Sequence, residues 1–484
     1  LKVSKALTCL EPKAVWSYFN EITKIPRSSS HEEKIAEFIL KFAKVHGFKS
    51  HKDEVGNVII DIEATEDKKD APLVILQGHM DMVPVVEDGY THDFLKEGIK
   101  AYVDAPFVKA EHTTLGADNG IAIALVMALA DDKTLSHGPL RAVFTVEEET
   151  TMKGATGLSP EYLHGDYLIN LDSEDNGYLF VNCAGSYDVN IKFNFSKVET
   201  EDTKALEITM SHLAGGHSGA DIHLGHANAI KLLASLLDDM SDDVDFFINN
   251  ISGGAVRNAI PSKAQCTICV PEKEIDTAKS KLNELFKVQK EIYAKTDPMM
   301  TLEITESDKR DALGYAQTLD LIHFIRSLPN GIMRMSPEFS GIVETSINLG
   351  VINSDNDCVK ICMLARSLNS DALSDMINTV KSQCYLLDNV EVEESNRHEP
   401  WSSPSKNRLI DVLNESYKSV TGNEFKVTAL HAGVECATFA KANKKLQLIS
   451  IGPTVLNPHS PKERVDIEGV KDIYLTVSRA LAML

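Results

Sequence analysis

The sequence predicts an α/β protein of two domains, in which a discontinuous first domain has a mostly parallel sheet covered by helices and contains an inserted second α/β domain. The chain has 484 residues, more than the roughly 250 to 300 at which single hydrophobic cores stop growing. Helical and strand-like patterns alternate through its first third, and the same texture returns near the C-terminus. We therefore expect two cores, one of them formed by both ends of the chain.

Short apolar runs bounded by polar residues predict the strands of the first domain. These runs lie at 58–62, 73–78, 140–146, 167–171 and 446–451. Helical periodicity predicts helices at 11–22, 32–45, 120–130 and 406–419. The second helix is preceded by Ser30-x-x-Glu33, which matches a capping box. We expect residues 1–184 and 398–484 to form this domain.

The inserted domain, expected at 185–397, begins where the pattern changes to amphipathic strands, such as 189–195 and 206–210. A weak internal repeat follows. The strand-like run 263–270 precedes a helical run at 274–287, and the strand-like run 358–365 likewise precedes a helical run at 371–384. The polar stretch 391–405 predicts a linker back to the first domain.

Composition narrows the classes of partner. The formal net charge is −22, from 49 basic and 71 acidic residues, which disfavours nucleic acid and anionic membranes because binding phosphate needs clustered Lys and Arg. No apolar run approaches the ~18 residues of a membrane span. The first residues, Leu1-Lys2-Val3-Ser4, lack the plan of a secretory signal, although a start other than Met leaves open that the chain is already trimmed.

The cysteines indicate a reducing compartment. Eight cysteines are spread thinly along the chain, without the density of a disulfide scaffold, so a cytoplasmic location fits best. Cys266 and Cys269 have CxxC spacing but lie inside a predicted strand, where residues three apart point to opposite faces. A metal or redox role there is therefore disfavoured.

Side chains able to bind metal lie just past the ends of the predicted strands. His79, Glu149, Asp172 and His459 each follow one apolar run, and Asp118 begins the predicted helix at 120–130. Ligands bind at the carboxyl edge of open α/β sheets. A set of His, Asp and Glu ligands in this arrangement suits a pair of divalent ions.

Each of these positions also has a plainer interpretation. His79-x-Asp81 places both side chains on one face of a strand end, where Asp81 could orient a metal-bound imidazole, or both could be ordinary surface residues. Asp118 could instead cap its helix. His459, between Pro458 and Pro461, could be part of a rigid surface loop.

Three consecutive acids, Glu147, Glu148 and Glu149, follow the run 140–146. Such carboxylates repel one another unless cations or solvent relieve them. Neighbours in an extended segment point opposite ways, so one of them could bind metal while another faces an attacking water as general base. An exposed acidic turn is the alternative.

Together these motifs resemble the M20 metallopeptidases. The resemblance rests on Gly78-His79-Met80-Asp81, Gly116-Ala117-Asp118-Asn119-Gly120, Glu148-Glu149, Asn170-Leu171-Asp172 and Pro458-His459-Ser460. Gly116-Ala117-Asp118, His431-Ala432-Gly433-Val434-Glu435-Cys436 and Gly452-Pro453-Thr454 with the His459 motif resemble the aminoacyl-histidine dipeptidase branch in particular. The likeness covers essentially the whole chain, although Glu147 stands where the family commonly has Asp.

The resemblance implies a role for each residue. His79 and Asp172 would hold one zinc ion, Glu149 and His459 a second, and Asp118 would bridge them, with Mn or Co as possible substitutes. Asp81 would support His79, and Glu148 would activate the water shared by the two metals. The implied reaction is hydrolysis of the peptide bond of free dipeptides, including Xaa-His.

The resemblance also makes the inserted domain a lid and dimerisation domain. His217, within Gly215-Gly216-His217-Ser218-Gly219, would reach across a homodimer as an oxyanion donor. Arg366 would bind the terminal carboxylate of the substrate, and Asn258 and Gly433 would be further substrate contacts, although turn or surface roles fit these residues nearly as well. Hinges near Gly185 and Arg397 would let the lid close and exclude water.

Two rival functions remain open. An amidohydrolase acting on N-acyl amino acids would use the same metal ligands. A metal-binding or dimeric scaffold without turnover is disfavoured by Glu148, because a pure binding site has no need of an acid beside a ligand.

Overall fold

The computed structural model describes residues 6–308, 311–404 and 406–484. The contacts divide the chain into two compact units. Unit 1 comprises Leu1–Asn182, Trp401–Thr428 and Val434–Leu484, and unit 2 comprises Cys183–Pro400 and Ala429–Gly433. The return of 429–433 to unit 2 has no counterpart in the sequence-based division. The segment 1–4, from which the lack of a secretory signal was inferred, lies outside the described residues.

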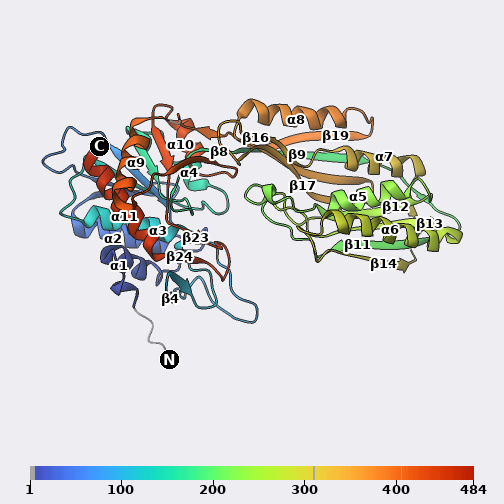
Figure 1. The fold of residues 1–484 in the computed structure, drawn as a ribbon, viewed down its shortest axis with the longest axis horizontal. Coiled ribbons are helices and arrows are strands. Elements are labelled where there is room, and N and C mark those ends of the chain that lie inside the picture. Colours follow the sequence, from blue (N-terminus) through green and yellow to red (C-terminus); the bar gives the residue numbers. More distant parts are fainter. Residues whose placement is uncertain (1–5, 309–310, 405) are drawn as a thin grey trace. The chain divides into compact units, whose positions relative to one another are not determined.

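Figure 1 traces the chain with its elements labelled where there is room. The main sheet of unit 1 has a parallel centre. Its strand order is β1 (Lys49–Lys52), β2 (Val58–Ile62), β6 (Leu140–Thr145), β3 (Val74–His79), β7 (Tyr167–Asn170), β22 (Gln447–Ser450), β8 (Tyr178–Cys183) and β20 (Trp401–Ser402), with β21 (Lys426–Leu430) beside β8. Strands β6, β3, β7 and β22 pair in parallel, whereas β2 and β8 join them antiparallel. The α/β fold with a largely parallel core is confirmed, with antiparallel strands at both margins.

Helices pack on this sheet. They are α1 (Lys13–Ile22), α2 (Glu33–His46), α3 (Ala117–Asp131), α4 (Lys153–Gly157), α9 (Arg408–Thr421), α10 (Cys436–Ala442) and α11 (Ile467–Met483). Helix α3 contacts β3, α2 contacts β2, and α9 contacts β22. Helix α3 is buried on every side from Gly120 to Ala130, as expected of a helix that is apolar all round. A small sheet of β4 (Ala101–Asp104), β5 (Phe107–Ala110), β24 (Arg464–Asp466) and β23 (Val455–Leu456) completes unit 1.

The parallel centre decides where the functional side chains go. Parallel strands buried on both faces read as continuous apolar runs, and β3 and β7 are buried along nearly their whole length. Because β3, β6, β7 and β22 run in one direction, the segments that follow them leave the sheet at the same edge. His79, Glu149, Asp172 and His459 all lie at or beyond these strand ends.

Unit 2 is built on an antiparallel sheet. Its order is β14 (Thr301–Ser307), β11 (Thr203–Ser211), β13 (Ala264–Pro271), β12 (Phe247–Gly253), β17 (Val343–Ser354), β18 (Cys358–Ser367), β9 (Gly185–Asn194) and β19 (Val390–His398), with β16 (Gly331–Met335) paired to β17. A separate pair joins β10 (Lys197–Glu199) to β15 (Asp311–Leu313). The expected strand–helix repeat is present: β13 is followed by α6 (Ile275–Ile292), and β18 is followed by α8 (Ser370–Cys384).

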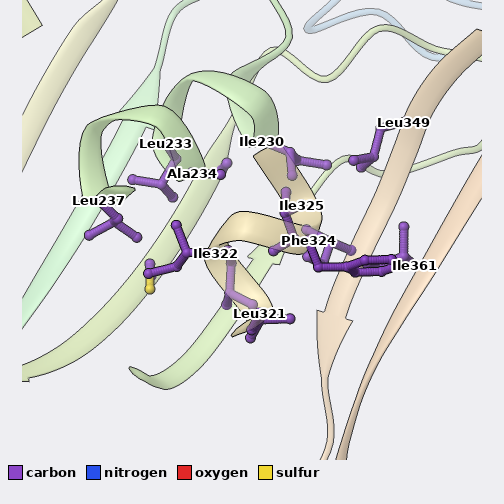
Figure 2. Close-up of a cluster of buried hydrophobic side chains, with 14 of the residues drawn as sticks. Ile230, Leu233, Ala234, Leu237, Leu321, Ile322, Phe324, Ile325, Leu349 and Ile361 are labelled. Carbon is purple, nitrogen blue, oxygen red and sulfur yellow. The ribbon is translucent and has the colours of Figure 1, made fainter. Parts of the chain in front are cut away.

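Helices α5 (Ala229–Met240), α6, α7 (Tyr315–Ser327) and α8 cover this sheet. Their apolar faces form one core with the strands, which includes Leu233, Leu237, Ile322, Phe324 and Leu349 (Figure 2). Alternate residues of β11, such as Leu206, Ile208 and Met210, join this core. This is the pattern of a sheet with one face packed on helices.

Two local predictions are wrong. Much of the stretch 391–405 is not a linker, because residues up to His398 form strand β19 at the margin of the unit 2 sheet; Ser405 lies outside the described residues. The Ser30-x-x-Glu33 capping box is also absent, since helix α2 has no side-chain cap. The Glu32 carboxylate instead accepts hydrogen bonds from Ser30 N and Glu147 N.

Both CxxC cysteines are buried, as are most of the other cysteines. Within the described residues, no helix combines the length and apolarity needed to cross a bilayer.

Candidate metal centre

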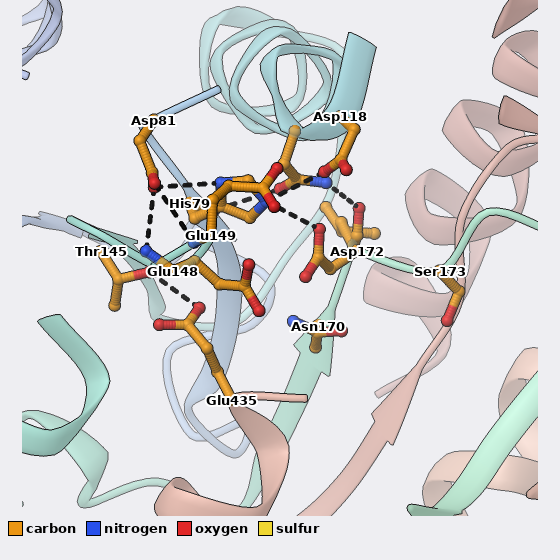
Figure 3. Close-up of polar contacts among 12 residues, drawn as sticks. His79, Asp81, Asp118, Thr145, Glu148, Glu149, Asn170, Asp172, Ser173 and Glu435 are labelled. Carbon is orange, nitrogen blue, oxygen red and sulfur yellow. Dashed lines mark hydrogen bonds and ion pairs between the residues drawn. The ribbon is translucent and has the colours of Figure 1, made fainter. Parts of the chain in front are cut away.

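The side chains predicted to bind metal converge at the carboxyl edge of the unit 1 sheet (Figure 3). His79 ends β3, Glu149 lies in the turn after β6, and Asp172 follows β7. Asp118 lies in the first turn of α3, and His459 lies in the loop between β23 and β24. Segments distant in sequence thus supply a single cluster.

Asp118 lies at the centre of this cluster. One of its carboxylate oxygens is 3.0 Å from His79 Nε2 and the other is 3.1 Å from His459 Nε2. His79 Nε2 is also 3.3 Å from Asp172 Oδ1, and His459 Nε2 is 2.9 Å from Glu149 Oε2. The cluster therefore contains two overlapping groups, His79–Asp118–Asp172 and Asp118–Glu149–His459, in each of which the ligand atoms lie within 4.8 Å of one another. A third such group joins His79 with Glu148 and Glu149.

The Asp118 side chain does not cap its helix. Helix α3 has no side-chain cap, and its backbone is non-helical at Asp118 and Asn119. This irregular turn directs the carboxylate toward the two imidazoles. The plain capping interpretation is therefore excluded for Asp118.

The electrostatics of the cluster fit a cation. Burial and the nearby charge of Asp118 raise the pKa of Glu149 to about 7. Hydrogen bonds to Asp118 and Glu149 raise the pKa of His459 to about 11. Glu149 Oε1 is buried and has no hydrogen-bond partner, which leaves an acceptor atom available. Carboxylates and imidazoles held this close suit divalent ions.

Asp81 orients both His79 and the acidic turn. Its side chain is fully buried, and Oδ1 lies 3.2 Å from His79 Nδ1. Asp81 also accepts hydrogen bonds from Ser29 Oγ and from the backbone N–H groups of Glu148 and Glu149. A carboxylate on the far nitrogen of an imidazole fixes which nitrogen faces a metal.

Glu148 projects into the cluster beside Glu149 (Figure 3). Burial raises the pKa of its carboxyl group well above the usual value, and the charges of Asp172 and Glu149 add to this effect. Glu147, in contrast, points to Lys153 and Thr151. The three acids therefore have different surroundings, and the interpretation as a solvated acidic turn holds only for Glu147.

Arg27 is a residue that the sequence analysis missed. It is buried and donates hydrogen bonds to Met80 O and Asp81 O at 3.0 and 2.9 Å, and to Gly116 O. It thereby joins the segment after His79 to the segment before Asp118. Glu463 braces the same loop, since its carboxylate accepts from the N–H groups of Leu115, Gly116 and Asp118.

Asn119 is a second such link. Its Oδ1 accepts from His79 N at 3.1 Å, and its Nδ2 donates to Leu171 O at 3.0 Å. A Cβ at Gly78 would lie 2.5 Å from Asn119 Oδ1. The Gly78-His79 and Asp118-Asn119 motifs therefore depend on each other sterically, which only the packing of α3 on β3 reveals.

Backbone strain is concentrated around the cluster. His459 has φ 56° and Glu147 has φ 52°, in the left-handed region that non-glycine residues rarely adopt. Such positions cost free energy and persist where the surrounding structure fixes them. At His459 the strained turn carries an imidazole to Asp118 and Glu149.

The expected substrate residues lie in unit 2. His217 and Arg366 are neighbours, with Nε2 3.5 Å from Nη2. Asn258 is beside this loop, since its carbonyl accepts from Ser218 N, and Gly433 closes the segment 429–433 in the same unit. The sequence analysis included His431 in a motif but gave it no role. Its backbone oxygen would lie 2.4 Å from a Cβ at Gly219. Its Nε2 is 2.7 Å from Ser346 Oγ.

Known proteins resemble this chain along its whole length. Residues 75–483 match Peptidase family M20/M25/M40. The chain is 35% identical over 477 residues to the cytosol non-specific dipeptidase of Escherichia coli (strain K12), covering 98% of each protein. Among solved structures, aminoacylhistidine dipeptidase from Vibrio alginolyticus superimposes with a TM-score of 0.85 at 33% identity, covering 99% of this chain and 98% of the other.

A more distant structure shares the fold. Aminopeptidase PepT from Bacillus cereus has a TM-score of 0.59 at 15% identity, with 98% of both chains covered. The profile match over most of the chain and the full-length identity to a dipeptidase agree with the metal-ligand geometry at the sheet edge. The chain therefore belongs to Peptidase family M20/M25/M40.

Proposed function

We propose that this protein is a dizinc dipeptidase that hydrolyses the peptide bond of free dipeptides, including Xaa-His. Its relatives, a cytosol non-specific dipeptidase and an aminoacylhistidine dipeptidase, support this substrate class. The observation that carries the proposal is the position of Asp118, whose two oxygens each face a different imidazole. This is the arrangement expected of a carboxylate that bridges two ions.

In this proposal His79 and Asp172 hold one ion, Glu149 and His459 hold the other, and Asp118 is shared. Zinc fits this ligand set, with Mn or Co as alternatives. When bound, the ions would polarise the scissile carbonyl and lower the pKa of water. Asp81 would keep His79 Nε2 directed at its ion through the contact at Nδ1.

Glu148 is the proposed general base. Its carboxylate is next to the ligand Glu149. Among the described residues, no hydrogen bond joins it to the imidazole of His79 or of His459. It would take a proton from the attacking water and return that proton to the leaving amine. Proton transfer by a positioned carboxylate contributes typically ~10²- to 10⁴-fold to rate.

Arg366 is the proposed partner of the substrate carboxylate. Arg366 is 7% exposed, and its Nε has no hydrogen-bond partner. Among the described residues, no carboxylate forms an ion pair with it. Burial lowers the pKa of Arg366 to about 10; the charge of Arg257 adds to this effect, and that of Asp188 opposes it. A buried guanidinium that forms no ion pair with a carboxylate is costly, and a bidentate substrate carboxylate would relieve that cost.

His217, Asn258 and Gly433 would complete substrate recognition, with His217 as oxyanion donor. We propose a homodimer in which His217 serves the partner's site, and lid closure at hinges near Gly185 and Arg397. The thin spread of the eight cysteines, without the density of a disulfide scaffold, supports a cytoplasmic location.

Substrate comparison tests this function. Purified enzyme supplied with zinc should hydrolyse Gly-Leu and an Xaa-His dipeptide, and should leave N-acetyl amino acids intact. Activity on the acylated compounds alone would replace the dipeptidase assignment with the rival amidohydrolase. Sedimentation of the same protein tests the dimer separately, and a monomer with full activity would contradict the proposed exchange of His217.

A further inference from the structure

A second layer of polar side chains lies directly beneath the metal ligands. Gln77 and Asn170 precede His79 and Asp172 by two residues. Gln77 shares a face of β3 with His79, and Asn170 is the last residue of β7, just before the segment that carries Asp172. Gln77 Oε1 accepts from Asn170 Nδ2 at 2.6 Å, and Asn170 Oδ1 accepts in turn from Ser450 Oγ at 2.5 Å. The layer therefore crosses β3, β7 and β22.

Glu435 closes this layer from the start of helix α10 (Figure 3). Its Oε2 accepts from Gln77 Nε2 at 2.6 Å and from Thr145 Oγ1 at 2.8 Å. Thr145 is the last residue of β6, directly before the turn that carries Glu148 and Glu149. Glu435 thus contacts the two strands that carry most of the proposed catalytic groups.

The Glu435 carboxylate is not needed to satisfy the layer. Its side chain is 0% exposed, Oε1 has no hydrogen-bond partner, and it takes part in none of the ion pairs found among the described residues. A glutamine would offer Gln77 and Thr145 the same acceptor oxygen. A buried negative charge without a counter-ion costs free energy, so the fold alone gives no reason for an acid at this position.

Divalent ions held by the proposed ligands would supply the missing counter-charge. Burial raises the pKa of Glu435 to about 7, and the carboxylate of Asp172 adds to the effect while His79 opposes it. The acid is thus electrostatically coupled to both proposed ligands of one ion. Divalent cations at that site would stabilise its charge, and its charge would stabilise them.

We propose that Glu435 is a positioning residue of the metal centre, whose buried negative charge increases the affinity for divalent cations and lowers the stability of the metal-free protein. The inference rests on the proposed function, since it takes His79 and Asp172 as metal ligands. The same carboxylate would stabilise the metal-bound protein and destabilise the metal-free protein.

Glu435→Gln tests both effects. The variant should bind zinc about 10- to 100-fold more weakly, the range typical when a residue outside the ligand shell that supports a metal site is lost. A chelator-competition titration of the metal-free full-length protein measures this change. Its melting temperature in excess chelator should be higher than that of the unmodified protein. A merely structural role would lower the melting temperature, so the two readouts separate the explanations.

Two control variants accompany it. Thr145→Val removes one hydrogen bond to Glu435 but keeps the charge, so it should weaken zinc binding much less than Glu435→Gln. Glu344→Gln changes another buried acid, which lies in unit 2 and faces Arg334, and should leave zinc affinity unchanged.

The outcomes are distinguishable. Unmodified protein that binds no zinc overturns the proposed function and this inference together. Unmodified protein that binds zinc while Glu435→Gln binds it equally well overturns this inference alone. So do a Glu435→Gln protein that is less stable without metal or fails to fold, and a Thr145→Val protein that loses as much affinity.

Discussion

Replacing Arg27 by methionine tests whether a buried guanidinium holds the metal-binding edge of unit 1 together. Arg27 is 2% exposed and bonds to the carbonyls of Met80, Asp81 and Gly116. Methionine has a similar volume but a shorter, apolar side chain without hydrogen-bond donors. The substitution therefore removes the bonds without opening a large cavity.

The expected loss follows from these contacts. A hydrogen bond from a charged donor contributes about 1.5 to 3 kcal/mol, so the three bonds amount to ~4.5 to 9 kcal/mol. Burying the guanidinium offsets several kcal/mol of this gain. We expect the free energy of unfolding of unit 1 to fall by about 3 to 5 kcal/mol, as when other buried charged contacts lose one partner.

Urea unfolding in excess chelator, followed by tryptophan fluorescence, measures this loss without a contribution from metal binding. The chain has 2 Trp residues, and both Trp16 and Trp401 belong to unit 1, so the signal reports on that unit. Arg141→Met is the matched control, because Arg141 forms a partly exposed ion pair with Asp61 and should contribute only about 1 kcal/mol or less. An Arg27→Met protein that loses no more than this control would refute the reasoning.

Three further predictions concern the site and the lid. Glu148→Gln should lower kcat for Gly-Leu by about 10²- to 10⁴-fold while elemental analysis finds unchanged zinc, and retained activity would remove Glu148 from proton transfer. Arg366→Met should raise KM for dipeptides much more than for the corresponding dipeptide amides, which lack the carboxylate, and an equal increase for both would contradict the assigned contact. Burial lowers the pKa of His431 to about 3, with the charge of Arg366 contributing, so the unfolded chain takes up this proton near pH 6.5 while the folded chain does not. Unit 2 should therefore lose up to about 1.4 kcal/mol of stability per pH unit as pH falls from 6.5 toward 3. In circular dichroism melts, His431→Gln should flatten this part of the plot of stability against pH. An unchanged slope would show that His431 is not the group responsible.

Local patterning was sufficient to locate the proposed metal ligands along the chain. The strands β3, β6 and β7 are apolar runs with abrupt polar ends, and His79, Glu149 and Asp172 stand at those ends. The period of two along a strand also places Asp81 beside His79. Local rules succeed here because burial on both faces leaves a continuous signal that needs no knowledge of distant contacts.

The same rules failed where most of an element is polar. Strand β19 has no fully buried residue, and its apolar alternation is limited to Val390 and Val392, which pack on the unit 2 core. The rest of its sequence lacks the alternation that indicates a half-buried strand. It is a strand because its backbone pairs with β9. Backbone pairing at a sheet margin depends on a neighbour that the local sequence does not specify.

The sequence by itself determined the α/β class, the strands whose ends carry His79, Glu149 and Asp172, and the residue types suited to divalent metals. Only the tertiary structure decided that Arg27, Glu435 and Glu463 support them, because a buried polar group is defined by its partners. Gln77 and Glu435 are 358 residues apart in sequence, and Leu115 and Glu463 are 348 apart. Hydrophobic periodicity shows which face of an element is buried, but a charge buried within that face gains its partner only from the path of the folded chain.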